Sequence, residues 1–219
     1  SMNTFSSFLN SFYCHILGTK FNRRIIVDDL PTDNNLYGTK KIIFHPNMLP
    51  PIVIADPELT FGLPAHITSV VGMDALSHNL EGYCAAGNHP MADGIALEAI
   101  RLIAANLEAA VYDPSNLQAR SAMMTASLMG ATAFQKGLGA MHSMAHVVGG
   151  RLNTHHGRTI AIVMPYVLVA NRPAIEARIV RLARHIEIES ATFDGFVKWI
   201  CDLRKRYSIP NTLAEVGVD

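Results

Sequence analysis

Cysteines are few in this sequence, and their positions suggest no pairing. The 219 residues contain three, Cys14, Cys84 and Cys201, which lie far apart and form no CxxC motif. An odd number of widely spaced cysteines argues against a disulfide framework and is typical of proteins kept in a reducing compartment. We therefore expect a cytoplasmic location.

The sequence also lacks an excess of charge of either sign. Lysine and arginine together number 18, as do aspartate and glutamate, so the formal net charge is zero. Recognition of nucleic acid requires clustered basic residues. The one short basic run, Arg204–Arg206, is typical of a solvated helix end. These features predict no nucleic-acid partner.

The sequence has no apolar run close to the roughly 20 residues that cross a bilayer. Its most apolar stretch, residues 160–171, is shorter and is interrupted by Pro165. The chain begins with Ser1 and Met2, which resemble a remnant of tag removal, and not with a basic segment followed by an apolar one. We predict a core helix at 160–171 and no membrane partner.

Apolar residues are plentiful, at 49% of the chain, which is enough to bury a substantial core. Short runs with β propensity occur within residues 1–60, at Arg24–Val27, Lys41–Phe44 and Ile52–Ile54. From Asp56 onward the apolar pattern is helical. We predict a mainly α fold with short β segments in residues 1–60, divided into a remnant or linker region at 1–55 and an all-α domain at 56–219.

Prolines, glycines and capping residues place the expected helices. Pro64 suits a first helical turn, and Gly72 is expected to break or kink that helix. Asn116 is a candidate N-cap, and the pair Gly149–Gly150 is expected to end a helix. The predicted helices then cover about 73–84, 90–111, 117–135, 140–148, 157–171, 174–186 and 192–207.

Two clusters of metal-ligand residue types lie on these helices. In GMDALSHNLEGY, Asp74 and His78 are four residues apart, so both side chains share one helix face. Such a pair alone is more often a surface contact than a metal site. The segment GLGAMHSMAHVVGGRLNTHHG adds four histidines, which are His142, His146, His155 and His156.

The second cluster is the stronger signal. His142 and His146 are again four residues apart and are surrounded by small and apolar residues. Buried imidazoles need polar partners, and a metal ion can supply one. Ordinary hydrogen-bonded core histidines are the alternative. Three imidazoles and one carboxylate suit Fe²⁺ or Zn²⁺, and Fe²⁺ is favoured if the site is catalytic, because an open coordination position is then needed.

These two motifs, in this order, closely resemble the iron-containing (group III) alcohol dehydrogenase family. The similarity runs from about Lys41 to the C-terminus and implies the helical domain of the dehydroquinate-synthase-like type. The family's ligand pattern is an Asp, a His four residues on, the first His of the HxxxH helix and the His of an HG turn. The resemblance therefore implies the metal ligands Asp74, His78, His142 and His156.

The resemblance also implies an activity and two further site residues. Members transfer hydride between a small alcohol or aldehyde and NAD or NADP, with a metal ion that activates the substrate oxygen. His146 matches a histidine near the substrate and nicotinamide, so it is expected to bind cofactor and relay protons. Phe134 loosely matches an aromatic residue of the substrate pocket. His155 stands where many relatives have proline and is assigned no catalytic role.

The match fails where the family binds its nucleotide. The sequence has no GGGS-type turn and no GxGxxG motif, which would cradle the pyrophosphate. It also stops where relatives continue with further helices, so we expect the domain at 56–219 to be incomplete. The chain resembles the metal-binding half of a dehydrogenase. Alone, it is expected to show weak or no NAD(P)-dependent turnover. Apolar faces that a missing domain would cover favour homo-oligomerisation.

Two other functions compete with this one. A non-catalytic metal-binding or oligomerisation domain is consistent with the missing nucleotide motifs. A metal-assisted hydrolase would need a general base near the metal, and Glu81, one turn beyond His78, is the nearest candidate.

Overall fold

The computed structural model describes residues 25–27, 41–43 and 52–218. Strands β1 (Ile25–Val27) and β2 (Lys41–Ile43) pair antiparallel, with Ile26 opposite Ile42. The third predicted strand, Ile52–Ile54, is wrong: this segment has no regular secondary structure, and both isoleucines are exposed. Two of the three short β segments are therefore confirmed, whereas the division at residue 55 stays a prediction.

The remainder of the described chain is helical, as predicted. The helices are α2 (Ala65–Cys84), α3 (Pro90–Tyr112), α4 (Leu117–Ala133), α5 (Ala140–Leu152), α6 (His156–His185) and α7 (Phe193–Arg206), with short 3-10 helices η2 (Pro57–Thr60), η3 (Phe134–Lys136) and η4 (Ala214–Val216). Asn116 caps α4, and Asp56 caps η2 by accepting a hydrogen bond from the Glu58 amide.

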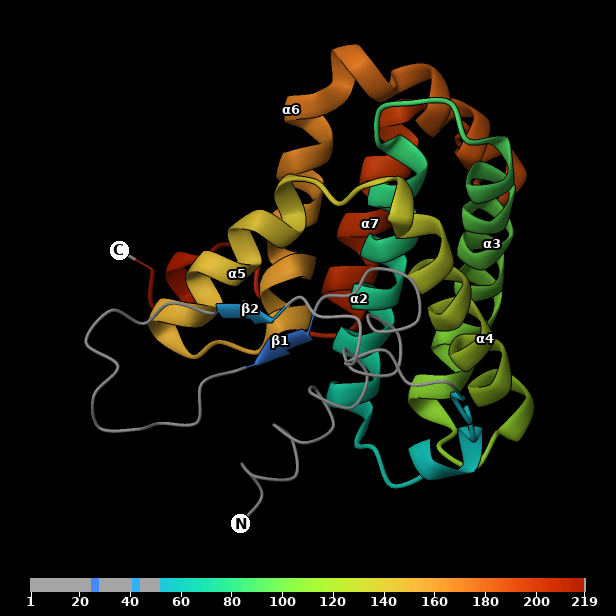
Figure 1. The fold of residues 1–219 in the computed structure, drawn as a ribbon, viewed down its shortest axis with the longest axis vertical. Helices are drawn as coiled ribbons and strands as arrows, with labels where there is room; N and C mark the ends of the chain where they lie inside the picture. Colours follow the sequence, from blue (N-terminus) through green and yellow to red (C-terminus); the bar gives the residue numbers. More distant parts are fainter. Residues whose placement is uncertain (1–24, 28–40, 44–51, 219) are drawn as a thin grey trace.

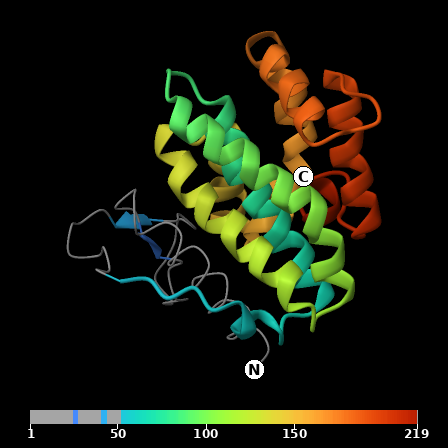
Figure 2. The ribbon, with the colours of Figure 1, turned by 90° about the vertical axis from the view of Figure 1, so that its right-hand side faces the viewer.

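Helix α2 forms the centre of the domain. It packs against α3, α4 and α6, and Figure 1 shows it enclosed between α3 and α4 on one side and α5 and α6 on the other. Turned by 90°, the ribbon shows α6 and α7 as a second layer beside the first helices (Figure 2). A central helix must be buried on most sides, and α2 contains the fully buried Met73, Leu76 and Leu80.

The predicted break at Gly72 is wrong, because α2 runs through it without interruption. A Cβ on Gly72 would lie 2.2 Å from Leu107 Cδ1 of α3. The glycine thus permits close approach of α3, and the tertiary contact outweighs its low helix propensity.

Helices α5 and α6 also differ from their predicted limits. Helix α5 continues through Gly149–Gly150 to Leu152, and Asn153 ends it in the left-handed conformation, with φ of 50°. The two helices predicted at 157–171 and 174–186 are one element, α6, which contains Pro165 and Pro173. Its ribbon turns over at the top of the molecule (Figure 1). Such a bend is the expected consequence of internal prolines, which lack an N–H and crowd the preceding turn.

Helix α6 is long and apolar enough to cross a membrane by length and composition, with a mean hydropathy of 1.3 in its most apolar window. Half of that window is buried inside the domain, and core helices meet the same criterion. Ile160, Ile162 and Met164 are fully buried. The prediction that no segment is long enough is therefore wrong, whereas the buried residues fit the predicted core helix.

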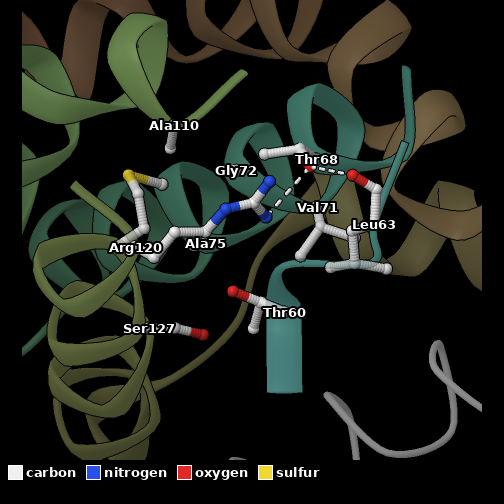
Figure 3. A pocket seen from close by; sticks show the side chains of 10 residues that line it. Thr60, Leu63, Thr68, Val71, Gly72, Ala75, Ala110, Arg120 and Ser127 are labelled. Carbon is white, nitrogen blue, oxygen red and sulfur yellow. Dashed lines mark hydrogen bonds between the residues drawn. The ribbon is translucent and has the colours of Figure 1, made fainter. Parts of the chain in front are cut away.

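A buried arginine connects α4 to the start of α2. Arg120 is 3% exposed, and its guanidinium donates hydrogen bonds to Thr68 Oγ1 and to the Pro114 carbonyl. Figure 3 shows it reaching across a small cavity of about 30 Å³ towards Thr68. None of the predicted site residues lines this cavity, so its contribution is to the packing of α2.

Candidate metal centre

Three helices bring the predicted ligands together. Asp74 and His78 lie on α2, His142 lies in the first turn of α5, and His156 is the first residue of α6. The Nε2 atoms of His142 and His156 lie 3.7 Å and 3.9 Å from Asp74 Oδ1. One ligand atom from each of Asp74, His142 and His156 lies within 4.8 Å of the others, a grouping that can hold a metal ion.

His142 has the orientation of a ligand. The residue is 3% exposed, and its Nδ1 lies 2.8 Å from Glu81 Oε2. Its Nε2 is buried and has no hydrogen-bond partner among the described residues, although it faces Asp74. A buried ring nitrogen without a partner is costly, and coordination of a divalent cation would satisfy it. The residues present therefore fit the metal that the spacing predicts.

His78 lies beside this group and outside it. Its ring centroid is 4.5 Å from that of His142 and 5.4 Å from that of Phe134. Its ring nitrogens are not part of the group of atoms within 4.8 Å of one another. The structure thus brings three of the four predicted ligands to one point and places the fourth against the ring of one of them.

The charges at the site suit cation binding. Burial lowers the pKa of His78 to about 4, even though the nearby Asp74 carboxylate acts in the opposite direction. Burial acts to raise the pKa of Asp74, but His78, His156 and His142 outweigh it, and the pKa is lowered. At neutral pH Asp74 is ionised and His78 is neutral, which are the protonation states that metal ligands require.

The structure places His146 at the margin of the cluster. It is half-buried on α5, with its ring centroid 5.1 Å from that of His156 and 6.4 Å from that of His142. Phe134 is buried in η3 against His78. His155 is the N-cap residue of α6 and contributes to lowering the pKa of Asp74, less than His78, His156 and His142 do. The roles assigned to His146 and Phe134 stay predictions.

Glycines let two helices approach α2 at this point. A Cβ on Gly157 would lie 2.4 Å from the carbonyl oxygen of Val70, so the first turn of α6 rests on the α2 backbone. A Cβ on Gly130 of α4 would lie 3.2 Å from His78 Cβ. The close approach at Gly157 brings His156 near Asp74, and the one at Gly130 packs α4 against His78.

Glu81 is the residue that the motifs did not connect to the histidines. It is 6% exposed and contacts His142 across 61 positions of sequence. Its spacing could have drawn attention, because Asp74, His78 and Glu81 follow at intervals of four and three residues on one helix face. Nothing in the sequence indicates which histidine it would meet.

Comparisons with known proteins place this geometry in a family. The family model described as "Fe-containing alcohol dehydrogenase family, C-terminal" matches residues 68–219. The chain is 40% identical to 4-hydroxybutyrate dehydrogenase of Cupriavidus necator over 82% of its own length and 49% of that protein. It is also 40% identical to 1,3-propanediol dehydrogenase of Klebsiella pneumoniae, covering 82% of this chain and 48% of the relative.

Solved structures agree with these relatives. The crystal structure of a 1,3-propanediol oxidoreductase superposes with a TM-score of 0.80 at 35% identity, over 90% of this chain and 52% of the other. Sulfoacetaldehyde reductase of Bifidobacterium kashiwanohense, in complex with NAD+, gives 0.75 at 29% identity, over 83% and 48%. The chain spans about half the length of the curated relatives it matches. It belongs to the Fe-containing alcohol dehydrogenase family and corresponds to the C-terminal part of its members.

Proposed function

We propose that this chain is the metal-binding part of an iron-dependent, NAD(P)-linked alcohol dehydrogenase that also reduces aldehydes. The observation that carries the proposal is the convergence of Asp74, His142 and His156, with a buried His142 nitrogen facing the carboxylate. Iron is supported by the family name. NAD or NADP is supported by a neighbour in complex with NAD+. A small alcohol or aldehyde substrate is supported by the names of the relatives.

Asp74, His142 and His156 would hold the metal, with His78 as the fourth ligand. Their nitrogen and oxygen donors also suit Zn²⁺. A bound divalent cation supplies Lewis-acid polarisation of a substrate oxygen. The helices contribute buried surroundings in which Asp74 is kept ionised and His78 is kept neutral.

His146 is proposed to relay the proton. A half-buried imidazole one ring away from His156 can exchange a proton at a ring nitrogen with solvent on one side and with substrate on the other. Phe134 is proposed as an apolar wall of the substrate pocket, since it is buried against His78.

Association with further protein surface is also proposed. Helix α5 exposes Met144, Val147 and Leu152, with exposed fractions of 41%, 58% and 43%. Apolar residues gathered on the helix that carries two of the site histidines favour contact with another subunit or domain. We expect a homo-oligomer in the cytoplasm.

The proposal is tested by anaerobic titration of the metal-free chain with Fe²⁺. We expect one Fe²⁺ per chain and loss of binding in His156→Ala, because one of three converging donors is removed. The matched control is His185→Ala at the exposed opposite end of α6, which should bind as the unmutated chain does.

Titration with NAD+ and NADP+ then separates the dehydrogenase from a non-catalytic metal-binding domain. Micromolar nucleotide affinity supports the dehydrogenase. A chain that binds neither Fe²⁺ nor Zn²⁺ would contradict the metal-centre proposal altogether.

A further inference from the structure

Both side-chain oxygens of Glu81 form hydrogen bonds where α2 meets the start of α5. Oε1 accepts a hydrogen bond from the Met141 amide at 2.7 Å, and Oε2 accepts one from the Gly139 amide at 2.7 Å. Oε2 also lies 2.8 Å from His142 Nδ1. A single buried carboxylate of α2 therefore contacts the start of α5 at three residues, Gly139, Met141 and His142.

Helix α5 needs this contact. Its N-cap residue is Gly139, which offers no side-chain acceptor. The first amides of a helix have no partner inside the helix, and their dipoles attract negative charge. Glu81 satisfies two of these amides from a neighbouring helix and so replaces the missing cap. A Cβ on Gly139 would lie 2.8 Å from Glu81 Oε1, so the glycine gives the carboxylate room.

The third contact determines the chemistry of His142. Both Glu81 oxygens already accept hydrogen bonds from backbone amides, so the remaining lone pairs can only accept again. The His142 Nδ1 is then the protonated nitrogen, and the Nε2 lone pair is left free on the side that faces Asp74. In metal sites a histidine that donates its other N–H to a carboxylate is fixed in ring orientation and is a stronger ligand.

We propose that Glu81 is a positioning residue of the metal centre, which fixes the Nδ1–H tautomer and ring orientation of His142 so that Nε2 can bind a divalent cation. The inference rests on the proposed metal-binding function and assigns a role to a residue outside the predicted ligand set. It also gives Glu81 a role different from that of the general base considered for a hydrolase, since its carboxylate is already engaged by two amides and by His142.

The experiment is a Co²⁺ titration of the metal-free chain, followed by the d–d absorption of the bound ion. In Glu81→Gln, an NH₂ group replaces one of the two oxygens and cannot accept a hydrogen bond. Facing His142, it would remove the Nδ1–H tautomer, and facing the Met141 amide, it would remove part of the α5 cap. We expect Co²⁺ affinity to fall roughly 10- to 100-fold, the range for loss of such an outer partner. The matched control is Asn116→Ala, which removes the cap of α4 and should lower the melting temperature without changing Co²⁺ affinity.

A second measurement needs no variant. Nitrogen-15 chemical shifts of the histidine rings in the metal-free chain report which nitrogen of His142 carries the proton. We expect a protonated Nδ1 and a bare Nε2. A protonated Nε2 in the unmutated chain would overturn the inference, as would unchanged Co²⁺ affinity in a folded Glu81→Gln chain whose His142 has lost the proton on Nδ1. If the unmutated chain binds no Co²⁺ yet shows a protonated Nδ1, the metal-centre proposal fails while the orienting role of Glu81 is supported.

Discussion

At the scale of single residues, the site depends on how closely α6 can approach α2. Gly157 follows the candidate ligand His156, and a Cβ there would also lie 3.3 Å from Asp74 Cβ. The obstacle at 2.4 Å is the backbone oxygen of Val70, which cannot rotate out of the way as a flexible side chain could. The distance between the two candidate ligands is therefore controlled by the residue beside them.

Gly157→Ala should separate these two helices. We expect a loss of about 1–3 kcal/mol in the free energy of unfolding, the usual result of overpacking, together with weaker Co²⁺ binding. Urea denaturation and Co²⁺ titration measure the two effects.

Gly94→Ala serves as the matched control for that substitution. Gly94 is exposed in α3, and a Cβ there would meet nothing within 4 Å. The change should stabilise the chain by roughly 0.5–1 kcal/mol, because alanine loses less conformational freedom in a helix. Equal effects of the two substitutions would contradict the close-contact interpretation.

The sequence predicts individual ligand candidates better than it predicts their surroundings. Residue types and spacing mark two clusters of ligand candidates, the family resemblance selects Asp74, His142 and His156 within them, and the structure brings these three to one point. The Glu81 contact could not be predicted, since it depends on how α5 packs on α2. The exact place of His78, beside the ring of His142, depends on the same packing.

At the scale of helices, the sequence located nearly every element and misjudged what glycine does inside them. Gly72 and Gly149–Gly150 were expected to end helices, and each lies within one. Local propensity cannot reveal that the Gly72 position faces Leu107 of another helix. The prolines of α6 show the same limit, since they bend the element without ending it.

A cluster of three charges joins four of these elements. Asp93 of α3 accepts hydrogen bonds from Lys136 of η3 at 2.7 Å and from Arg178 of α6 at 2.9 Å. Both cations also donate to the carbonyl oxygen of Tyr83 near the end of α2. The Lys136 side chain is only 3% exposed, so it depends on Asp93 for compensation of its charge. Lys136 precedes the turn that leads into α5.

Asp93→Asn should destabilise the chain at neutral pH by about 3–5 kcal/mol, because it leaves a buried ammonium group without its counter-charge. Burial acts to raise the pKa of Asp93, but Lys136 and Arg178 outweigh it, and the pKa is lowered below 3.8. A carboxylate with a lowered pKa stabilises the fold above its ordinary pKa, and this contribution is lost as the pH falls through the lowered value.

The difference between the two chains should therefore be largest near neutral pH and shrink below about pH 4. Chemical denaturation from pH 7 down to pH 3 measures it. Glu98→Gln, in the exposed pair with Arg101, is the control and should cost less than about 1 kcal/mol at any pH. A constant deficit for Asp93→Asn at all pH values would argue against the charge cluster.

At the scale of the whole molecule, the proposed metal centre can form only in the folded chain. Its candidate ligands are separated by up to 82 positions, from Asp74 to His156, and they meet through the packing of α5 and α6 on α2. A ligand that binds the folded state alone stabilises it in proportion to the logarithm of its concentration. If the proposed centre binds metal, folding and metal binding are therefore coupled.

Removal of metal should lower the melting temperature. At a free Fe²⁺ or Zn²⁺ concentration of 100 times Kd, the gain is about 2.7 kcal/mol, which corresponds to roughly 5–10 °C for a chain of this size. Differential scanning calorimetry with and without a chelator measures the shift. His142→Ala should melt at the same temperature in both conditions, and a metal-dependent shift in that variant would place the metal elsewhere.

The cap that Glu81 provides to α5 affects how often the first turn of this helix opens. The ends of helices fray fastest, and His142 lies in the first turn of its helix. The carboxylate that holds this turn closed is the same one that holds the imidazole. Opening of the turn would therefore also release the imidazole, so hydrogen exchange of the Met141 amide should report how often the proposed centre comes apart.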